Sequence, residues 1–231
     1  LADAKIHFDY CVVGEPSSAQ TLGDMIRVGR RGSLNAHLVI RGKSGHVAYP
    51  DTLVNPIHQA MPAINALACK QWDQGNDFFP PTTFQVSNFN AGVGVQNVVP
   101  GDAQVEFNFR YSSASTQADL IGQTEAILTA HGLDYEITWA LSGEPFLTEK
   151  GRLIDAAVAT LRAITDQEVI LSTGGGTSDG RFIAPYGIEL IELGLVNKTI
   201  HKVNERVRVE DLAVLTTIYT DLLVRLVGSH D

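Results

Sequence analysis

Four short segments of the sequence place glycine beside acidic, hydroxyl or imidazole side chains, at the ends of apolar runs or in loops. They are residues 14–18 (GEPSS), 42–50 (GKSGHVAYP), 172–181 (STGGGTSDGR) and 199–205 (TIHKVNE). Functional groups often lie at such positions, because a rigid scaffold holds them while the loop keeps them accessible. These segments are therefore the candidates for metal-binding, anion-binding or catalytic groups.

Glu15 and His201 are potential metal ligands. Glu15 follows an apolar run, so its carboxylate projects from a strand end, where it could bind a cation or remain a solvated turn residue. His201 precedes the last helical segment, although most single histidines are not ligands. A zinc site needs three or four ligands. The sequence contains no H-E-x-x-H motif, no paired-cysteine motif, and no H-x-D motif near paired acidic residues, so neither residue makes a site alone.

His46 and the glycine run 174–176 suggest oxyanion and anion chemistry. A neutral imidazole at position 46 could donate a hydrogen bond to a developing oxyanion or ligate a metal, and an ordinary surface histidine is the alternative. Consecutive glycine amides beside hydroxyls, before an expected helix start, predict an anion cradle in preference to a tight turn capped by Asp179. The run is neither a Walker A loop nor a dinucleotide fingerprint.

The middle of the chain has the periodicity of an α+β domain. Alternating residues predict strands at 33–41, 82–89, 104–111 and 135–140, and three-to-four spacing predicts helices at 54–72 and 118–131. Pro62 is expected to kink the first helix or to mark a late start, and Gly132 is expected to cap the second. The order strand, helix, strand, strand, helix, strand is typical of a ferredoxin-like fold.

The flanking segments have a different pattern. Short apolar strands are predicted at 8–13, 169–172 and 188–193, with amphipathic helices at 151–166 and 209–226. Helices alternating with buried strands indicate a layered α/β domain. We therefore expect one α/β domain, residues 1–30 and 146–231, interrupted by an inserted α+β domain at residues 31–145.

Composition narrows the classes of function. The chain has 231 residues, of which 44% are hydrophobic, and its net charge of -9 argues against binding nucleic acid or an anionic membrane. No apolar run approaches the ~20 residues of a membrane span. Cys11 and Cys69 lack C-x-x-C spacing and favour buried apolar roles in a reducing compartment, the cytoplasm. The first residues contain no signal peptide and no initiating Met, so we expect the natural chain to begin upstream.

Seven segments in order resemble the co-catalytic zinc hydrolase family that includes aminoacylases and glutamate-type carboxypeptidases. They are GEPSS, RRGS, GKSGHVAYP, QNVVP, FNFRY, STGGGTSDGR and TIHKVNE, within residues 14–205. The combination of GGGTSDGR with IHKVNE resembles the succinyl-diaminopimelate desuccinylase branch. The resemblance implies a partial three-layer α/β/α zinc-hydrolase domain, interrupted by an inserted α+β ferredoxin-like dimerisation (lid) domain of a homodimer.

The same resemblance implies roles for individual residues. Glu15 would ligate one zinc ion and His201 the other. His46 would reach across the dimer into the partner's site and stabilise the oxyanion of the tetrahedral intermediate, with Asn97 in the same region. The residues implied to bind the substrate's carboxylates and amide are Arg30, Ser33, Asn97, Arg110, Gly176, Thr177 and Asn197.

The implied reaction is hydrolysis of N-succinyl-L,L-diaminopimelate to succinate and L,L-diaminopimelate, a step in lysine and cell-wall precursor synthesis. Two zinc ions, replaceable by cobalt, would activate the attacking water. Guanidinium groups and glycine amides suit a substrate with several carboxylates. The alternatives are an acetylornithine deacetylase, a carboxypeptidase of the same family, or a non-catalytic dimerisation or binding module.

The sequence departs from the family pattern in two respects. It lacks the H-x-D histidine, the bridging Asp, and the adjacent Glu residues that serve as ligand and general base. Gln96 replaces the first residue of an Asn-Asn pair, which leaves the role of that position open. We therefore expect this chain by itself to be inactive and to bind little or no zinc.

Overall fold

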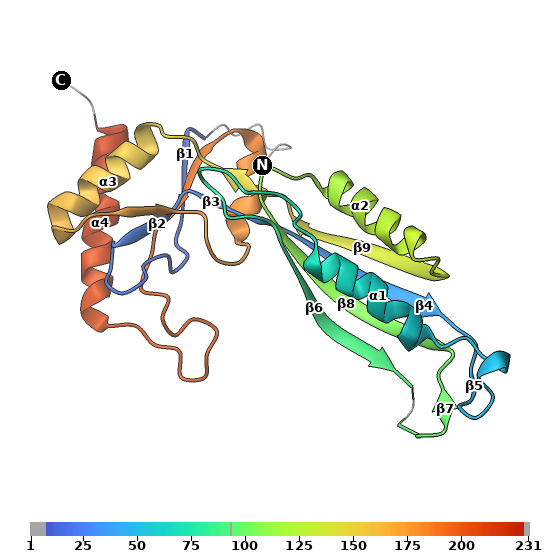
Figure 1. The fold of residues 1–231 in the computed structure, drawn as a ribbon. Helices are drawn as coiled ribbons and strands as arrows, with labels where there is room; N and C mark the ends of the chain where they lie inside the picture. The colour runs from blue at the N-terminus through green and yellow to red at the C-terminus, as the bar shows by residue number, and fades with distance from the viewer. Residues whose placement is uncertain (1–7, 93, 229–231) are drawn as a thin grey trace. The chain divides into compact units, whose positions relative to one another are not determined.

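The computed structural model describes residues 8–92 and 94–228 (Figure 1). The chain divides into two compact units. The outer unit comprises Leu1–Arg31 and Phe146–Asp231, and the inserted unit comprises Gly32–Pro145.

The inserted unit is a four-stranded antiparallel sheet with two helices (Figure 1). In chain order its main elements are β4 (Gly32–Arg41), α1 (Pro56–Cys69), β6 (Thr83–Ala91), β8 (Asp102–Tyr111), α2 (Gln117–Ala130) and β9 (Tyr135–Gly143). The strands lie in the order β6-β8-β4-β9. The first strand thus lies between the third and the fourth, and the predicted ferredoxin-like fold is confirmed. The short strands β5 (Gly45–His46) and β7 (Val98–Val99) pair with each other, and a 3-10 turn, Pro50–Thr52, follows β5.

Alternation along β4 and β8 builds the core of the inserted unit. Leu34 pairs with Phe109 and Leu38 pairs with Val105, so both strands bury apolar side chains. The ring centroid of Phe109 lies 4.6 Å from that of Trp72 and 5.2 Å from that of Phe84. These aromatic contacts join the sheet to the segment that follows α1.

Side-chain caps determine where the helices of this unit begin. The Asn55 side chain accepts hydrogen bonds from the amides of Ile57 and His58, which starts α1 at Pro56. Pro62 lies inside α1 and does not mark a late start. In α2, Thr116 and Asp119 form a capping box. Gly132 has φ +67 just beyond the end of this helix, as expected for a C-terminal cap.

The outer unit contains a four-stranded sheet and two long helices. Its elements are β1 (Tyr10–Val13), β2 (Met25–Arg27), α3 (Arg152–Thr165), β11 (Ile170–Ser172), β12 (Glu189–Glu192) and α4 (Val209–Val227). The strand order is β1-β12-β2-β11, and β3 (Gly29–Arg30) pairs separately with β10 (Phe146–Leu147). The two helices bury Leu161 and Leu222 against Ile26 of β2 and Ile191 of β12. This sheet is part of the predicted α/β domain.

Two local expectations, a helix after the glycine run and a buried Cys69, differ from the structure. The segment after the glycine run forms two 3-10 turns, Asp179–Phe182 and Ala184–Tyr186, so no long helix dipole points at this run. Ser178 occupies the N-cap position of the first of these 3-10 turns and makes no side-chain cap bond. Cys69 is exposed, not buried, at the end of α1.

None of the helices within residues 8–92 and 94–228 has the length and hydrophobicity that a membrane span requires.

We predict that Phe109→Ala destabilises the inserted unit by about 3–5 kcal/mol, because it opens a cavity among packed aromatic rings. Phe89→Ala, at a side chain 41% exposed, is the matched control and should cost less than about 1 kcal/mol. Both tryptophans, Trp72 and Trp139, lie in this unit, so urea unfolding followed by tryptophan fluorescence reports on it selectively. Equal losses for the two variants would contradict this account of the core.

Candidate metal and anion site

The parallel pairing of β1 with β12 places two of the candidate segments side by side. Val13 pairs with Glu192, so the two strands end at the same edge of the sheet. The segments that follow stay together, because the Ser18 amide donates to the Leu195 carbonyl at 3.2 Å and the Asn197 amide donates to the Ser18 carbonyl at 2.9 Å. The predicted site residues Glu15 and Asn197 therefore lie on adjacent segments.

The two proposed metal ligands lie within the outer unit but do not complete a metal site. Glu15 is half-buried, and a Cβ added at Gly194 would lie 2.4 Å from the Glu15 carbonyl oxygen. His201 is exposed, has φ +59, and its amide donates to the Glu205 carboxylate at 3.3 Å. Residues 8–92 and 94–228 contain no group of three or more potential ligands.

A buried ion pair lies beneath the glycine-rich turn. Arg30 donates from Nε and Nη2 to the carboxylate of Glu192, which is fully buried. Ser178 also donates to this carboxylate, and Arg30 Nη1 donates to the Gly174 carbonyl at 3.0 Å. One carboxylate therefore anchors both ends of the turn, through Arg30 at one end and Ser178 at the other.

The turn itself brings together the predicted residues Gly176 and Thr177 with Arg30. Gly175 has φ +94, and a Cβ at this position would lie 2.3 Å from Arg30 Nη1. Glycine is thus required here both by the backbone conformation and by the guanidinium that lies against it. Thr177 accepts a hydrogen bond from Arg181 Nη1 at 3.0 Å. The turn is therefore surrounded by guanidinium groups, which suits an anionic ligand.

His46 and Asn97 are neighbours at one end of the inserted unit. His46 pairs with Val98 across the β5–β7 ladder, and the Val47 amide donates to the Asn97 carbonyl at 3.1 Å. The exposed His46 ring accepts a hydrogen bond from the Ala48 amide at Nδ1, so Nε2 is the ring nitrogen that could contact another molecule. An imidazole that accepts at Nδ1 carries its proton on Nε2 when neutral, the form that donates to an oxyanion.

Ser33 and Arg110 are neighbours at the other end of the inserted unit, where β4 begins and β8 ends. They pair across β4 and β8, where Ser33 Oγ accepts from Asn108 and Arg110 Nη1 is buried without a partner among the described residues. Eight residue steps along β4 separate Ser33 from Arg41, a length of roughly 26 Å. His46 lies beyond the Arg41 end, so one copy of this unit cannot bring His46 to Ser33 and Arg110.

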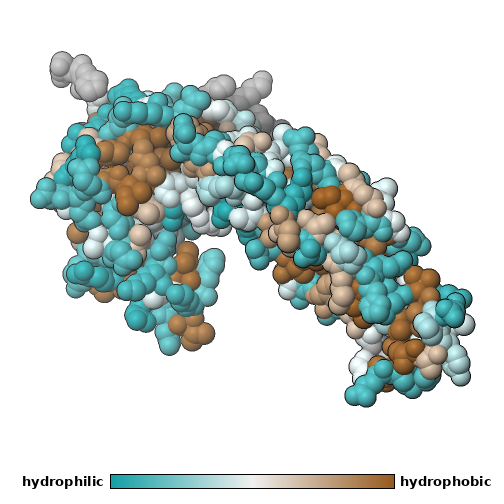
Figure 2. Space-filling model, viewed as in Figure 1, coloured by the Kyte–Doolittle hydropathy of each residue, from teal (hydrophilic) through white to brown (hydrophobic). Residues whose placement is uncertain are grey.

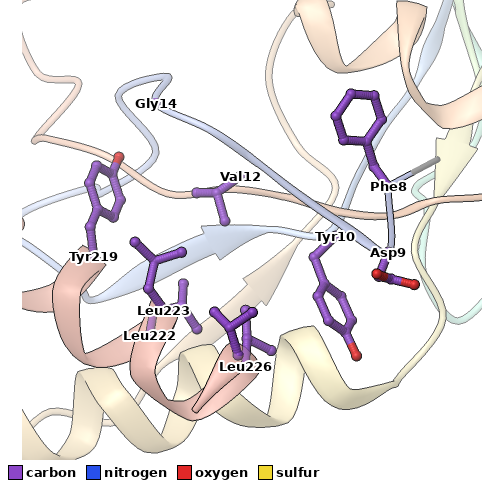
Figure 3. Close-up of a pocket in the computed structure, with 10 residues that line it drawn as sticks. Phe8, Asp9, Tyr10, Val12, Gly14, Tyr219, Leu222, Leu223 and Leu226 are labelled. Carbon is purple, nitrogen blue, oxygen red and sulfur yellow. The ribbon is translucent and has the colours of Figure 1, made fainter. Parts of the chain in front are cut away.

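An apolar groove opens along β1 and α4 of the outer unit. Its volume is about 510 Å³, and it is lined by Phe8, Asp9, Tyr10, Val12, Gly14, Tyr219, Leu222, Leu223, Leu226 and Val227. Figure 3 shows the Val12 side chain of β1 pointing toward the leucines of α4. Hydrophobic surface also gathers in this region in Figure 2. Within the described residues, β1 pairs with β12 alone, so its other edge is open.

The sequence interpretation missed Glu192 and Ser178 as parts of this site, and it did not select Arg27, whose Nη1 donates to Ser172 Oγ beside the turn. Glu192 offered a signal, because a charged residue at the end of the apolar run 188–193 needs a buried partner. Arg27 lies in β2, a three-residue strand too short for its periodicity to be recognised. The identity of each partner required the fold.

The chain is similar to proteins of known family and structure. Residues 28–136 match the family model of the peptidase dimerisation domain. A succinyl-diaminopimelate desuccinylase of Alkalilimnicola ehrlichii is 54% identical over 228 residues, an alignment that covers 99% of this chain and 61% of that protein. The chain is a homologue of the succinyl-diaminopimelate desuccinylases.

Two solved structures confirm the fold that the desuccinylase homologue adopts. The aminopeptidase PepT of Bacillus cereus superposes with a TM-score of 0.81 at 21% identity, covering 98% of this chain and 59% of that one. The YXEP protein of Bacillus subtilis, a dinuclear metal binding peptidase from the M20 family, superposes with a TM-score of 0.64 at 18% identity, covering 94% and 56%. The chain thus spans about three-fifths of the length of these proteins.

We predict that Glu192→Gln in this desuccinylase homologue lowers the free energy of unfolding of the outer unit by about 3–5 kcal/mol, since it leaves the Arg30 charge buried without a counter-charge. Replacing both partners, Arg30→Met with Glu192→Leu, should cost less than the single change. Asp155→Asn, which breaks the exposed ion pair with Lys150, should cost less than about 1 kcal/mol. Urea unfolding followed by circular dichroism measures all three. If Glu192→Gln lowered the free energy of unfolding only as much as Asp155→Asn, the Arg30–Glu192 pair would not be what stabilises the outer unit.

Proposed function

We propose that this chain is part of a zinc-dependent amide hydrolase that converts N-succinyl-L,L-diaminopimelate and water to succinate and L,L-diaminopimelate. The reaction would serve lysine and cell-wall precursor synthesis in the cytoplasm. The observation that carries the proposal is the 54% identity to a desuccinylase over nearly the whole chain. The adjacent segments that follow β1 and β12, which contain Glu15 and Asn197, support it.

The residues present do not make a zinc site on their own. Glu15 and His201 would give at most one ligand to each of two metal ions, fewer than the three that a catalytic zinc needs. In the proposed complete enzyme, two zinc ions, replaceable by cobalt, take their other ligands from residues outside this chain. The general base would also come from there. The chain's 61% coverage of its relative leaves room for such residues, and the chain alone is proposed to be inactive.

Substrate binding is proposed to use the clusters that the fold forms. A succinylated diaminopimelate carries several carboxylates, which guanidinium groups and backbone amides recognise. Within the outer unit these groups lie around the glycine-rich turn, and within the inserted unit Arg110 has a buried nitrogen that has no partner among the described residues. The proposed substrate-binding residues are Arg30, Ser33, Asn97, Arg110, Gly176, Thr177 and Asn197.

The active form is proposed to be a homodimer through the inserted unit. The match to the peptidase dimerisation domain supports this proposal. The length of the β4–β8 sheet also supports it, because His46 lies at the end opposite to Ser33 and Arg110. A second copy could bring His46 to the site that its own chain cannot reach. His46 would then donate to the oxyanion of the partner's site.

The proposal is tested by comparing hydrolysis of N-succinyl-L,L-diaminopimelate and N-acetylornithine. The assay uses the protein extended to the length of its relatives and, separately, this 231-residue chain. We expect zinc-dependent turnover of the succinyl substrate by the extended protein only, since the chain lacks ligands and a base. Elemental analysis should give well under one zinc per chain for the 231 residues. Preference for the acetyl substrate would favour the deacetylase alternative, and activity or stoichiometric zinc in the short chain would contradict the proposed division of ligands.

Mixed dimers test the role of His46 in the extended protein. His46→Ala and Glu15→Ala should each be inactive, for lack of the oxyanion donor and of a metal ligand. Subunit exchange between them should restore about a quarter of the wild-type rate. Half of the dimers would then be mixed, and each would carry one intact site. If His46 served its own chain, no mixed dimer would be active and the rate would stay at the level of the separate variants.

A second candidate function is specific to the chain as given. The dimerisation-domain match and the lack of a three-ligand group among the described residues favour a non-catalytic pairing module. Light scattering at micromolar concentration discriminates, because this candidate requires a dimer. A strict monomer would exclude it and would also count against the proposed cross-dimer role of His46.

A further inference from the structure

Arg27 is a third guanidinium group at the glycine-rich turn, at a position that the sequence interpretation did not select. Its Nη1 donates to Ser172 Oγ at 2.5 Å and lies 3.2 Å from the point where a Cβ on Gly174 would be. Its side chain is half-buried, and its Nε is buried without a hydrogen-bond partner among the described residues. Arg27 therefore lies against the turn and has a nitrogen that could still donate a hydrogen bond to a ligand.

The charge of Arg27 has no counter-charge in direct contact. Among the described residues, no carboxylate forms an ion pair with it. The nearby carboxylate of Glu192 is occupied by Arg30 and Ser178, and Asp24 accepts hydrogen bonds from the amides of residues 19–21. Burial and then the neighbouring charge of Arg30 lower the pKa of Arg27, although Glu192 and Asp24 oppose this. Because an arginine stays protonated, an anion would relieve this repulsion.

The turn supplies further donors beside Arg27. Within residues 8–92 and 94–228, the amides of Gly175, Gly176 and Thr177 donate no hydrogen bond. Gly175 is in the left-handed region at φ +94, and both Gly175 and Gly176 are exposed. Successive free amides in such a turn form a concave binding site for a carboxylate or phosphate.

Arg30 is less available than Arg27 for a ligand. Each of its three nitrogens already donates to Glu192 or to the Gly174 carbonyl, and only 8% of the residue is exposed. The Arg30–Glu192 pair thus positions the turn. A negatively charged ligand at this turn would therefore bind mainly to Arg27, which has an unused donor.

We propose that Arg27 is an anion-binding residue of this site, where its guanidinium and the amides of Gly175–Thr177 hold one carboxylate of the ligand. The anion's place in a substrate rests on the proposed hydrolase function, whereas the anion site itself does not. The proposal divides the work between two neighbouring arginines. Arg30 lines the site and shapes the turn, and Arg27 supplies the unused donors that contact this carboxylate.

Titration of the 231-residue chain with succinate at low ionic strength, followed by NMR chemical shifts or calorimetry, tests the proposal without metal or turnover. Wild type should bind millimolar succinate. Arg27→Gln should weaken binding roughly tenfold, and Arg27→Lys less, because lysine keeps the charge without the fork. Arg208→Gln removes the same charge at a side chain 75% exposed and should leave binding within about twofold.

Ser172→Ala tests whether Arg27 acts by binding the ligand or by supporting the turn. The variant removes the hydroxyl to which Arg27 donates but keeps the positive charge of Arg27. It should weaken binding less than Arg27→Gln. Equal losses for the two variants, unchanged binding by Arg27→Gln, or no binding by wild type would each overturn the proposal. Inorganic phosphate is titrated in parallel into wild type and Arg27→Gln. If Arg27→Gln lost phosphate binding but kept succinate binding, the assignment of the site to a carboxylate would be overturned. Failure of the hydrolysis assay would leave these results unaffected.

Discussion

The parallel pairing of β1 with β12 is the constraint on which the candidate site depends. It aligns Val13 with Glu192, residues far apart in the chain, and so makes two strands end together. Two buried serines extend the alignment past the strands, because Ser18 Oγ donates to the Gly194 carbonyl and Ser17 Oγ accepts from the Gly194 amide. The serines of GEPSS thus satisfy backbone groups, and Glu15 remains the residue with a side chain available for chemistry.

The second organising feature is the use of a single buried carboxylate at the end of β12. An ion pair removed from water stabilises a protein only if its remaining donors and acceptors are also satisfied. Glu192 meets this condition by accepting from Arg30 and Ser178, and Arg30 completes it through the Gly174 carbonyl. The same contacts fix the glycine-rich turn. The stability of the outer unit and the shape of the candidate anion site therefore depend on one set of hydrogen bonds.

The inserted unit holds its candidate functional residues at opposite ends of a long sheet. β4 and β8 pair over ten residues with Ser33 and Arg110 at one end, and the β5–β7 ladder with His46 and Asn97 lies past the other. A packed aromatic core keeps this sheet from bending the two ends together. This separation supports the proposed homodimer, as does the match to the model of a peptidase dimerisation domain.

The amino-acid sequence was enough to predict the order of the elements, the ferredoxin-like arrangement, the family resemblance and the segments that contain the candidate residues. Periodicity, glycine caps and motif order are local, and the long strands β4 and β8 express them strongly. Only the tertiary structure decided which groups meet. The partners of Arg30, the contact of Arg27 with the turn, and the end-to-end separation of His46 from Arg110 all depend on strand pairings between distant residues. No local pattern encodes such pairings, because strand register and burial arise from the packing of the whole unit.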